Sequence, residues 1–251
     1  MSTPGPESTL VITIVYENTT RDSELTAGWG FSALIQYRAH TVLFDTGADG
    51  PALVKNMATL HIAPQDIDAV VLSHNHWDHT GGLNALLATG IQPGVHLLPS
   101  FPAAMKQEIG QMTSVIETAP DQIISEGIFT TGEMNGDTPE QAIVIEVEQG
   151  IVIVTGCAHP GIVEIVRRVK ELSGKPIYLV LGGFHLKDKT PAEIAEIVQA
   201  FRRLGVEHAG PCHCTGDGAI EAFAAEYGDD FLPISTGTII EIAPPTEKAA
   251  G

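Results

Sequence analysis

Residues 73–83 of this 251-residue chain read Ser-His-Asn-His-Trp-Asp-His-Thr-Gly-Gly-Leu. The run places His74, His76, Asp78 and His79 directly after the apolar segment 69–72, which predicts a buried strand. Imidazole and carboxylate groups are the usual protein ligands of zinc and similar divalent ions. In a tight loop at a strand end, the first two histidines can reach one ion, and the Asp and the last histidine can reach a neighbouring ion. A polar loop whose histidines only cap backbone groups is the alternative, but so many ligand residues in so short a run favour a metal site.

Three further histidines each follow a predicted strand. They are His159 in Gly-Cys-Ala-His-Pro-Gly after 151–154, His185 in Gly-Gly-Phe-His-Leu after 177–181, and His213 in Cys-His-Cys-Thr-Gly after 206–209. Sites on open α/β sheets collect at the carboxyl ends of the strands. We therefore expect these histidines to lie at the same edge as the loop after residue 72.

The apolar pattern changes along the chain from short strands to alternating strands and helices. Many strands with several helices predict sheets packed on each other and covered by helices. The simplest organisation is one domain over 10–242 with disordered tails at 1–9 and 243–251. Strands are expected at 10–16, 32–37, 41–44, 69–72, 95–98, 123–130, 142–147, 151–154, 177–181 and 206–209, and helices at 51–60, 82–88, 101–110, 162–172, 192–204 and 219–227.

Composition limits the class of protein. The chain has 31 acidic and 13 basic residues, a formal net charge of −18, which argues against binding to nucleic acid or to an anionic membrane. Three cysteines are too few for a disulfide scaffold of this size. No charged leader precedes an apolar run, and no apolar stretch reaches the roughly 18 residues of a membrane helix. We expect a cytoplasmic protein that acts on a small molecule; the sequence leaves the oligomeric state open.

The run His-Asn-His-Trp-Asp-His-Thr-Gly-Gly resembles the signature loop of the metallo-β-lactamase superfamily. Asp45, in Phe-Asp-Thr-Gly, resembles the first motif of that superfamily. The motifs around His159, His185 and His213 resemble one branch, the 7,8-dihydropterin-6-methyl-4-(β-D-ribofuranosyl)aminobenzene 5′-phosphate synthases. The resemblance covers residues 10–241 and implies an α/β fold, a four-layer αββα sandwich of the metallo-β-lactamase type.

The resemblance also implies a site for two divalent ions, zinc first, with manganese or iron as alternatives. Asp45 would hydrogen-bond a ligand histidine and fix its ring, whereas a simple turn-forming Asp is the alternative. His96, the only histidine between His79 and His159, lies in the strand-like run 95–98 and is interpreted as structural. One ion would be held by His74, His76 and His159, and the second by Asp78, His79 and His213.

The chain departs from the superfamily pattern at the position of the bridging Asp, which holds Cys157. A thiolate can bind zinc, but a small buried cysteine is an equal alternative. Cys212 and Cys214 have a Cys-x-Cys spacing, which is not that of a structural zinc site, and are interpreted as packing residues, with a redox pair as a minor alternative. His213 is preferred over His185 as the last ligand.

His185 is then a candidate general acid or phosphate-binding residue, although a hydrogen-bonded histidine at a strand end is the alternative. Asp78 is the other catalytic candidate, because it can accept a proton if it is not fully ligating. Gly183 and Phe184 join His185 as candidate substrate-binding residues. The helix start after residue 161, with Lys187 and Lys189, would complete a phosphate pocket.

We therefore expect a metal-dependent hydrolase that uses a metal-bound hydroxide on a phosphoester, lactone or thioester. A synthase-type transferase, which forms a carbon–nitrogen bond on a dihydropterin phosphate ester with loss of pyrophosphate, is the alternative that the branch resemblance implies. A non-catalytic metal- or ligand-sensing module and an oxygen-reducing diiron protein are further alternatives. A phosphate-binding pocket beside the metal ligands would favour the transferase.

Overall fold

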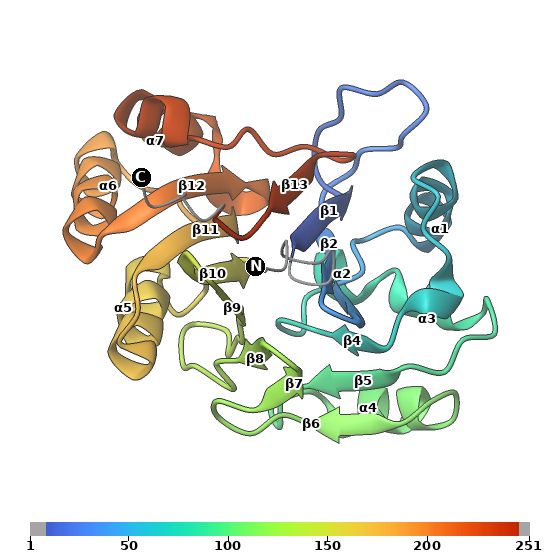
Figure 1. The fold of residues 1–251 in the computed structure, drawn as a ribbon. Coiled ribbons are helices and arrows are strands. Elements are labelled where there is room, and N and C mark those ends of the chain that lie inside the picture. Colours follow the sequence, from blue (N-terminus) through green and yellow to red (C-terminus); the bar gives the residue numbers. More distant parts are fainter. Residues whose placement is uncertain (1–8, 246–251) are drawn as a thin grey trace, which may run out of the picture.

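Two facing β-sheets form the centre of the structure, a computed structural model that describes residues 9–245 (Figure 1). The first sheet has the strand order β13-β1-β2-β3-β4-β5-β6 and the second has the order β12-β11-β10-β9-β8-β7. In each sheet one half is antiparallel and the other half is parallel. The strands are β1 Leu10–Tyr16, β2 Ser32–Tyr37, β3 His40–Phe44, β4 Ala69–Val71, β5 Gly94–Leu97, β6 Val115–Glu117, β7 Ile123–Ser125, β8 Ile128–Thr130, β9 Ile143–Val147, β10 Gly150–Thr155, β11 Ile177–Gly183, β12 Val206–Cys212 and β13 Ile239–Ile242.

Helices cover the outer face of both sheets (Figure 1). Helices α1, α3 and α4 pack on the first sheet, and α5, α6 and α7 pack on the second. The result is the predicted four-layer αββα sandwich. The helices are α1 Gly50–Thr59, α2 Trp77–Thr80, α3 Leu83–Leu87, α4 Ala103–Gly110, α5 Ile162–Ser173, α6 Pro191–Leu204 and α7 Asp217–Tyr227, with 3-10 turns at Pro64–Asp66, His213–Thr215 and Gly228–Asp230.

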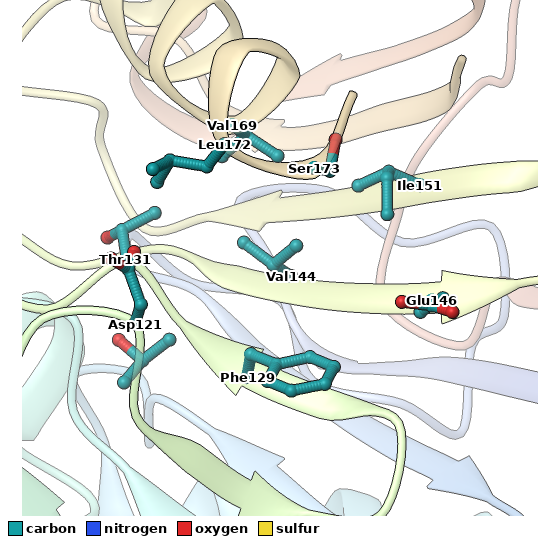
Figure 2. A pocket seen from close by; sticks show the side chains of 10 residues that line it. Asp121, Phe129, Thr131, Val144, Glu146, Ile151, Val169, Leu172 and Ser173 are labelled. Atoms are coloured by element: carbon teal, nitrogen blue, oxygen red, sulfur yellow. The ribbon is translucent and has the colours of Figure 1, made fainter. Parts of the chain in front are cut away.

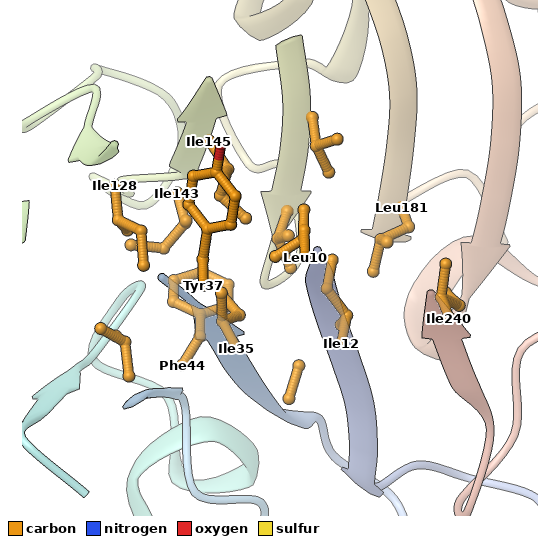
Figure 3. Packing of buried hydrophobic residues seen from close by; sticks show 14 of the residues in the cluster. Leu10, Ile12, Ile35, Tyr37, Phe44, Ile128, Ile143, Ile145, Leu181 and Ile240 are labelled. Atoms are coloured by element: carbon orange, nitrogen blue, oxygen red, sulfur yellow. The ribbon is translucent and has the colours of Figure 1, made fainter. Parts of the chain in front are cut away.

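Alternation along the strands separates the apolar layers. In β2, Ala33 and Ile35 face the second sheet, while Leu34 faces the helices. In β10, Val152 and Val154 face the first sheet, while Ile151 and Ile153 face α5 and α6. Figure 3 shows the interface between the sheets, where aliphatic side chains of the two sheets meet around Tyr37 and Phe44. Both strands are therefore buried on both faces, which explains their nearly continuous apolar sequence.

The predicted strand over 123–130 is wrong in detail, because the chain turns back at Gly127, whose φ of +79° suits glycine, and forms the hairpin β7–β8. Two strands, β6 and β13, were not expected. Strand β12 continues to Cys212, beyond the predicted end at 209, because it pairs with β11 as far as Gly183. The tails predicted at 1–9 and 243–251 fall almost wholly outside the described residues. Within residues 9–245 no helix has the length and apolarity to cross a membrane.

The sheets bring the ends of distant strands to one edge. Strands β3 and β4 are parallel neighbours in the first sheet, and β10, β11 and β12 are parallel neighbours in the second. Their carboxyl ends lead to Asp45, the histidine loop 73–79, and the loops that carry His159, His185 and His213. This topology is what gathers residues that lie far apart in the sequence.

Tyr227 provides a test of the outer helical layer. Its hydroxyl donates to the Val206 carbonyl of β12 at 3.3 Å, and Arg202 lies over its ring. Burial raises the pKa of Tyr227 to about 12 despite the nearby Arg202. The pKa of an unfolded tyrosine is about 10, so the folded state holds the Tyr227 proton more tightly. The protonated hydroxyl therefore contributes its full stabilisation below pH ~10, and this contribution is lost as the pH rises toward the folded pKa. The urea midpoint should therefore fall more steeply with alkaline pH in the wild type than in Tyr227→Phe; equal slopes would contradict this assignment.

Candidate metal centre

The histidine loop is folded tightly against the end of β3. His74 and His79 are fully buried, and Asp78 is nearly so. The Thr46 backbone N–H and hydroxyl both donate to the His79 carbonyl. A side chain at Gly82 would place its Cβ only 2.1 Å from the Thr46 carbonyl oxygen, so glycine is required for this approach. The Gly-Gly pair that ends the motif therefore serves the packing of the loop.

The Asp45 carboxylate holds this loop in place. Its Oδ1 accepts from the Ser73 backbone N–H, and its Oδ2 accepts from the Ser73 hydroxyl and from His79 Nδ1, all at 2.7 Å. The hydrogen bond fixes the His79 ring so that Nε2 faces the centre. Burial lowers the pKa of His79, but the adjacent Asp45 carboxylate more than offsets this and raises it to about 9.

The structure brings His74, His76 and His159 together. Their ligand nitrogens lie within 4.8 Å of one another, and His74 Nε2 is 3.0 Å from His76 Nδ1. Asp137 Oδ1 lies 3.0 Å from His159 Nδ1, whereas His159 Nε2 is buried with no hydrogen-bond partner. Burial, together with the neighbouring imidazoles, lowers the pKa of His74 well below its ordinary value. This keeps the imidazole neutral, which is the form that binds a metal.

Asp78, His79 and His213 form a second group of the same kind. His213 Nε2 lies 3.2 Å from His79 Nε2 and 3.3 Å from Asp78 Oδ2. Asn18 Oδ1 lies 3.1 Å from His213 Nδ1, and Glu17 accepts from the His213 backbone N–H. Burial alone would raise the pKa of Asp78, but the hydrogen bond and charge of His213 and the charge of His79 outweigh burial and hold this pKa well below its ordinary range. This group therefore combines a carboxylate with two facing imidazole nitrogens.

The chemistry of the surroundings fits divalent cations. Glu17, Asp45, Asp78 and Glu140 are all buried around the two groups, and no Lys or Arg is buried anywhere in residues 9–245. Buried carboxylates require compensating positive charge. The His74 and His79 rings lie 4.3 Å apart between centroids, so the two groups adjoin. Imidazole and carboxylate donors arranged in this way suit zinc, manganese or iron.

Cys157 lies between the two groups. Its Sγ is 3.3 Å from His79 Nε2, and it forms a further possible ligand set with His74 and His79. His96 lies apart, in β5, as a buried residue. The Cys157 sulfur is thus close enough to the centre to bind an ion there, and the two alternatives from the sequence, a metal ligand or a small buried residue, both stay open.

A chamber of about 530 Å³ opens beside this centre. It is lined by His159 and His185, whose rings lie 4.3 Å apart, and by the first residues of α5. Charged side chains of both signs reach it: Arg167 and Lys189, opposed by Asp137 and Glu164. Its apolar wall includes Ile162, Val163, Leu186 and Ile197.

The other expected substrate-binding residues are placed differently. Phe184 touches the chamber, but its ring packs on Phe201 and Phe223 in the helical layer. Gly183 does not line the chamber. Lys187 lies over the ring of Trp29, which in turn packs on His213, so it belongs to the opposite rim of the centre.

A second, apolar hollow of about 270 Å³ lies between the carboxyl end of α5 and strands β8 and β9 (Figure 2). Val169 and Leu172 of α5 face Phe129 and Val144 across it. Its lining contains no histidine or cysteine, and it lies at the end of α5 remote from His159. Of these two cavities, the chamber beside the histidines is therefore the one whose lining can take part in catalysis.

Sequence reasoning missed Glu140, which organises the loop after β10. Its Oε1 accepts from the backbone N–H groups of Cys157 and Ala158, and its Oε2 accepts from that of His159, at 2.8–2.9 Å. Burial raises the pKa of Glu140 to about 7, although these three N–H groups act in the opposite direction. No sequence signal marks this residue, because a carboxylate that accepts from backbone leaves no partner side chain to recognise. Asn18, whose Oδ1 lies 3.1 Å from His213 Nδ1, was missed as well.

Glu140→Gln should destabilise the loop, because an amide NH₂ cannot accept the hydrogen bonds that one carboxylate oxygen now receives. We expect the free energy of unfolding to fall by about 1–3 kcal/mol, measured by urea denaturation, together with a lower metal content after purification. Glu146→Gln is the matched control, since Glu146 is an exposed residue of β9 that pairs with Lys175. A Glu140→Gln variant as stable as this control would show that the carboxylate does not organise the loop.

The comparison with known proteins agrees with this geometry. The family model described as Metallo-beta-lactamase superfamily matches residues 26–223. The 7,8-dihydropterin-6-methyl-4-(beta-D-ribofuranosyl)-aminobenzene-5'-phosphate synthase of Methanocaldococcus jannaschii is 30% identical over 262 residues, which cover 84% of this chain and 89% of that protein.

Solved structures show the same fold. Tm1679, described as a metal-dependent hydrolase of the beta-lactamase superfamily, has a TM-score of 0.80 at 28% identity, with 93% of this chain and 99% of that chain covered. YhfI from Bacillus subtilis, a metallo-beta-lactamase fold protein, has a TM-score of 0.71 at 16% identity over 93% of this chain and 99% of that chain. The chain is thus an enzyme of a fold that binds divalent metal ions, and it belongs to the metallo-beta-lactamase superfamily.

Proposed function

We propose that this chain is a metal-dependent synthase-type transferase that joins a dihydropterin phosphate ester to an aminobenzene phosphate. Its M. jannaschii relative is named as the synthase of a dihydropterin-linked aminobenzene 5'-phosphate. The observation that carries this proposal is the chamber of about 530 Å³, which meets the first ligand group at His159 and contains cationic side chains. The identity of 30% over most of both chains supports it.

His74, His76 and His159 would hold one divalent ion, and Asp78, His79 and His213 would hold a second, with zinc the first candidate. Bound ions of this kind act as Lewis acids that neutralise the charge of a phosphorylated leaving group and polarise its oxygens. Asp45 and Asn18 keep the imidazoles of His79 and His213 in the ligating orientation.

Arg167 and Lys189 are the cations that would attract the phosphate of the substrate into the chamber. Both also pair with carboxylates, Arg167 with Glu164 and Lys189 with Glu193, so each can exchange one anionic partner for another. The first turn of α5, directly beside them, offers its backbone N–H groups. The apolar wall of the chamber would receive the ring system that carries the phosphate.

His185 is placed to assist at the mouth of the chamber. Its ring faces that of His159 and lines the chamber. An imidazole N–H in this position can donate to a phosphate oxygen or pass a proton to it. On the opposite rim, the half-exposed Trp29 offers a flat face near His213 on which an aromatic substrate can stack.

Hydrolysis of a phosphoester, lactone or thioester is the second candidate. The likeness to Tm1679, described as a metal-dependent hydrolase, favours it. In that reaction water would take the place of the amine, and Asp78 would accept its proton. The ligands are the same for both reactions, so the identity of the nucleophile separates them.

The test is to incubate metal-loaded protein with a 6-hydroxymethyl-dihydropterin pyrophosphate and 4-(ribofuranosyl)aminobenzene 5′-phosphate and to identify the products by mass spectrometry. We expect the coupled pterin product and pyrophosphate, and a KM for the aminobenzene phosphate that rises about three- to tenfold in Arg167→Ala/Lys189→Ala with kcat little changed, as expected for loss of two exposed phosphate contacts.

Arg203→Ala is the control for this variant, since Arg203 lies in the last turn of α6 and does not line the chamber. Hydrolysis products without coupling would support the second candidate instead. An unchanged KM in Arg167→Ala/Lys189→Ala would show that the chamber does not bind the substrate phosphate.

A further inference from the structure

A third cluster of ligand-bearing side chains adjoins the two groups described above. The sulfurs of Cys157 and Cys214 and an imidazole nitrogen of His185 lie within 4.8 Å of one another. Both cysteines are buried, at 4% and 2% exposure, and neither forms a disulfide. The proposed reaction gives Cys214 no task, and the sequence analysis interpreted it as a packing residue. Cys212, by contrast, packs between the two sheets.

The backbone is shaped to bring these three side chains together. They come from three loops, which follow β10, β11 and β12. Ala158, His185 and His213 each adopt a left-handed conformation, with φ of 61°, 53° and 53°. Such conformations cost free energy in residues other than glycine and persist where the surrounding structure enforces them. All three loops are thus turned sharply at the point where their ligands converge.

Gly183 is the spacer that allows the two cysteines to approach. An added Cβ at this position would lie 2.3 Å from the Gly156 carbonyl oxygen, 2.8 Å from Cys214 Sγ and 3.2 Å from Cys157 Cα. Any side chain here would push the Cys214 sulfur away from Cys157. Gly183 is therefore required both by the close approach of the loop after β10 and by the room that the Cys214 sulfur occupies.

The hydrogen bonding of the cluster is incomplete. Cys214 Sγ has a long contact of 3.6 Å to the Cys157 carbonyl oxygen. His185 Nδ1 is buried and has no partner. Buried polar atoms without a partner are uncommon and call for an explanation such as an ion. No Lys or Arg is buried among residues 9–245 to pair with a thiolate here.

The spacing suits a tetrahedral metal site. Ligands at about 2.3 Å for sulfur and about 2.0–2.1 Å for nitrogen lie roughly 3.4–3.8 Å apart around one ion. The ligand atoms of the cluster lie no more than 4.8 Å apart, so small side-chain movements would bring them to this spacing. Two sulfurs and one imidazole make a soft donor set, unlike the imidazole and carboxylate sets beside it, and such sets select zinc or copper(I) over magnesium, calcium or manganese.

We propose that Cys157, His185 and Cys214 form a separate, sulfur-rich site that binds one thiophilic metal ion next to the two histidine-rich groups. Cys157 Sγ lies 3.3 Å from His79 Nε2, so this site is in direct contact with the second group. The proposal does not depend on which reaction the enzyme catalyses. The imidazole nitrogen of His185 that is not engaged remains available to the chamber.

The test is a titration of metal-free, fully reduced protein with Cd²⁺, followed by ultraviolet absorbance of the thiolate–cadmium bond and by the number of ions retained after gel filtration. Wild-type protein should develop the absorbance of two thiolates. Cys214→Ala should lose at least half of it and retain one ion fewer, because one of the two sulfur ligands is removed. Cys212→Ala is the matched control and should titrate like the wild type.

Two further measurements keep the result interpretable. Circular dichroism establishes that each variant is folded. His76→Ala should lose an ion from the histidine group yet keep the full thiolate absorbance, which separates this site from the ions of the proposed reaction. Wild-type absorbance and stoichiometry in Cys214→Ala would overturn the proposal, and so would a Cys157–Cys214 disulfide found by mass spectrometry in freshly purified protein.

Discussion

The buried carboxylate of Asp45 is the interaction on which the rest of the centre depends. It lies at the end of β3, fully excluded from solvent, and it accepts three hydrogen bonds from Ser73 and His79. Those bonds join the end of β3 to the loop that follows its neighbour β4. They also consume His79 Nδ1, so the other nitrogen of that ring must face the centre. A single side chain thus fixes the loop position, the ring orientation and the tautomer.

The same arrangement recurs on the second sheet with different chemistry. There Glu140 accepts three backbone N–H groups and holds the loop that carries Cys157 and His159. Each sheet therefore contributes one buried carboxylate that organises one ligand loop. These carboxylates, with Glu17 and Asp78, leave a concentration of buried negative charge without a buried Lys or Arg in the described chain. Metal cations would balance this charge together with the His79 imidazole, whose pKa is raised beside Asp45.

Much of this candidate centre could be predicted from sequence because few residue types bind metal ions. The histidines of the loop after β4, and the single histidines after β10, β11 and β12, stood out by type and by position after apolar runs. Glu140 could not be found in this way, since it is one of 31 acidic residues and contacts only backbone in the loop. Cys214 was assigned to packing because its spacing from Cys212 is wrong for zinc, whereas its neighbours Cys157 and His185 come from other strands.

The secondary structure likewise divides into elements that the sequence pattern predicts and elements that it does not. The long apolar strands and amphipathic helices were predicted with nearly correct bounds, because their patterns extend over several turns or alternations. Strand β6 has three residues and carries too little pattern to recognise. Strand β13 pairs with β1, and Leu10 faces Ile242 from the other end of the chain. Pairing between such distant segments is decided by the assembled core and not by local sequence.

The most direct test of the central claim is anomalous X-ray diffraction from crystals of protein purified without chelator. We predict two strong peaks, one among the ligand nitrogens of His74, His76 and His159 and one among the ligand atoms of Asp78, His79 and His213, each about 2.0–2.2 Å from its ligands. Peaks at neither group, after reconstitution with zinc, manganese and iron in turn, would contradict the assignment of this edge of the sandwich as a metal centre.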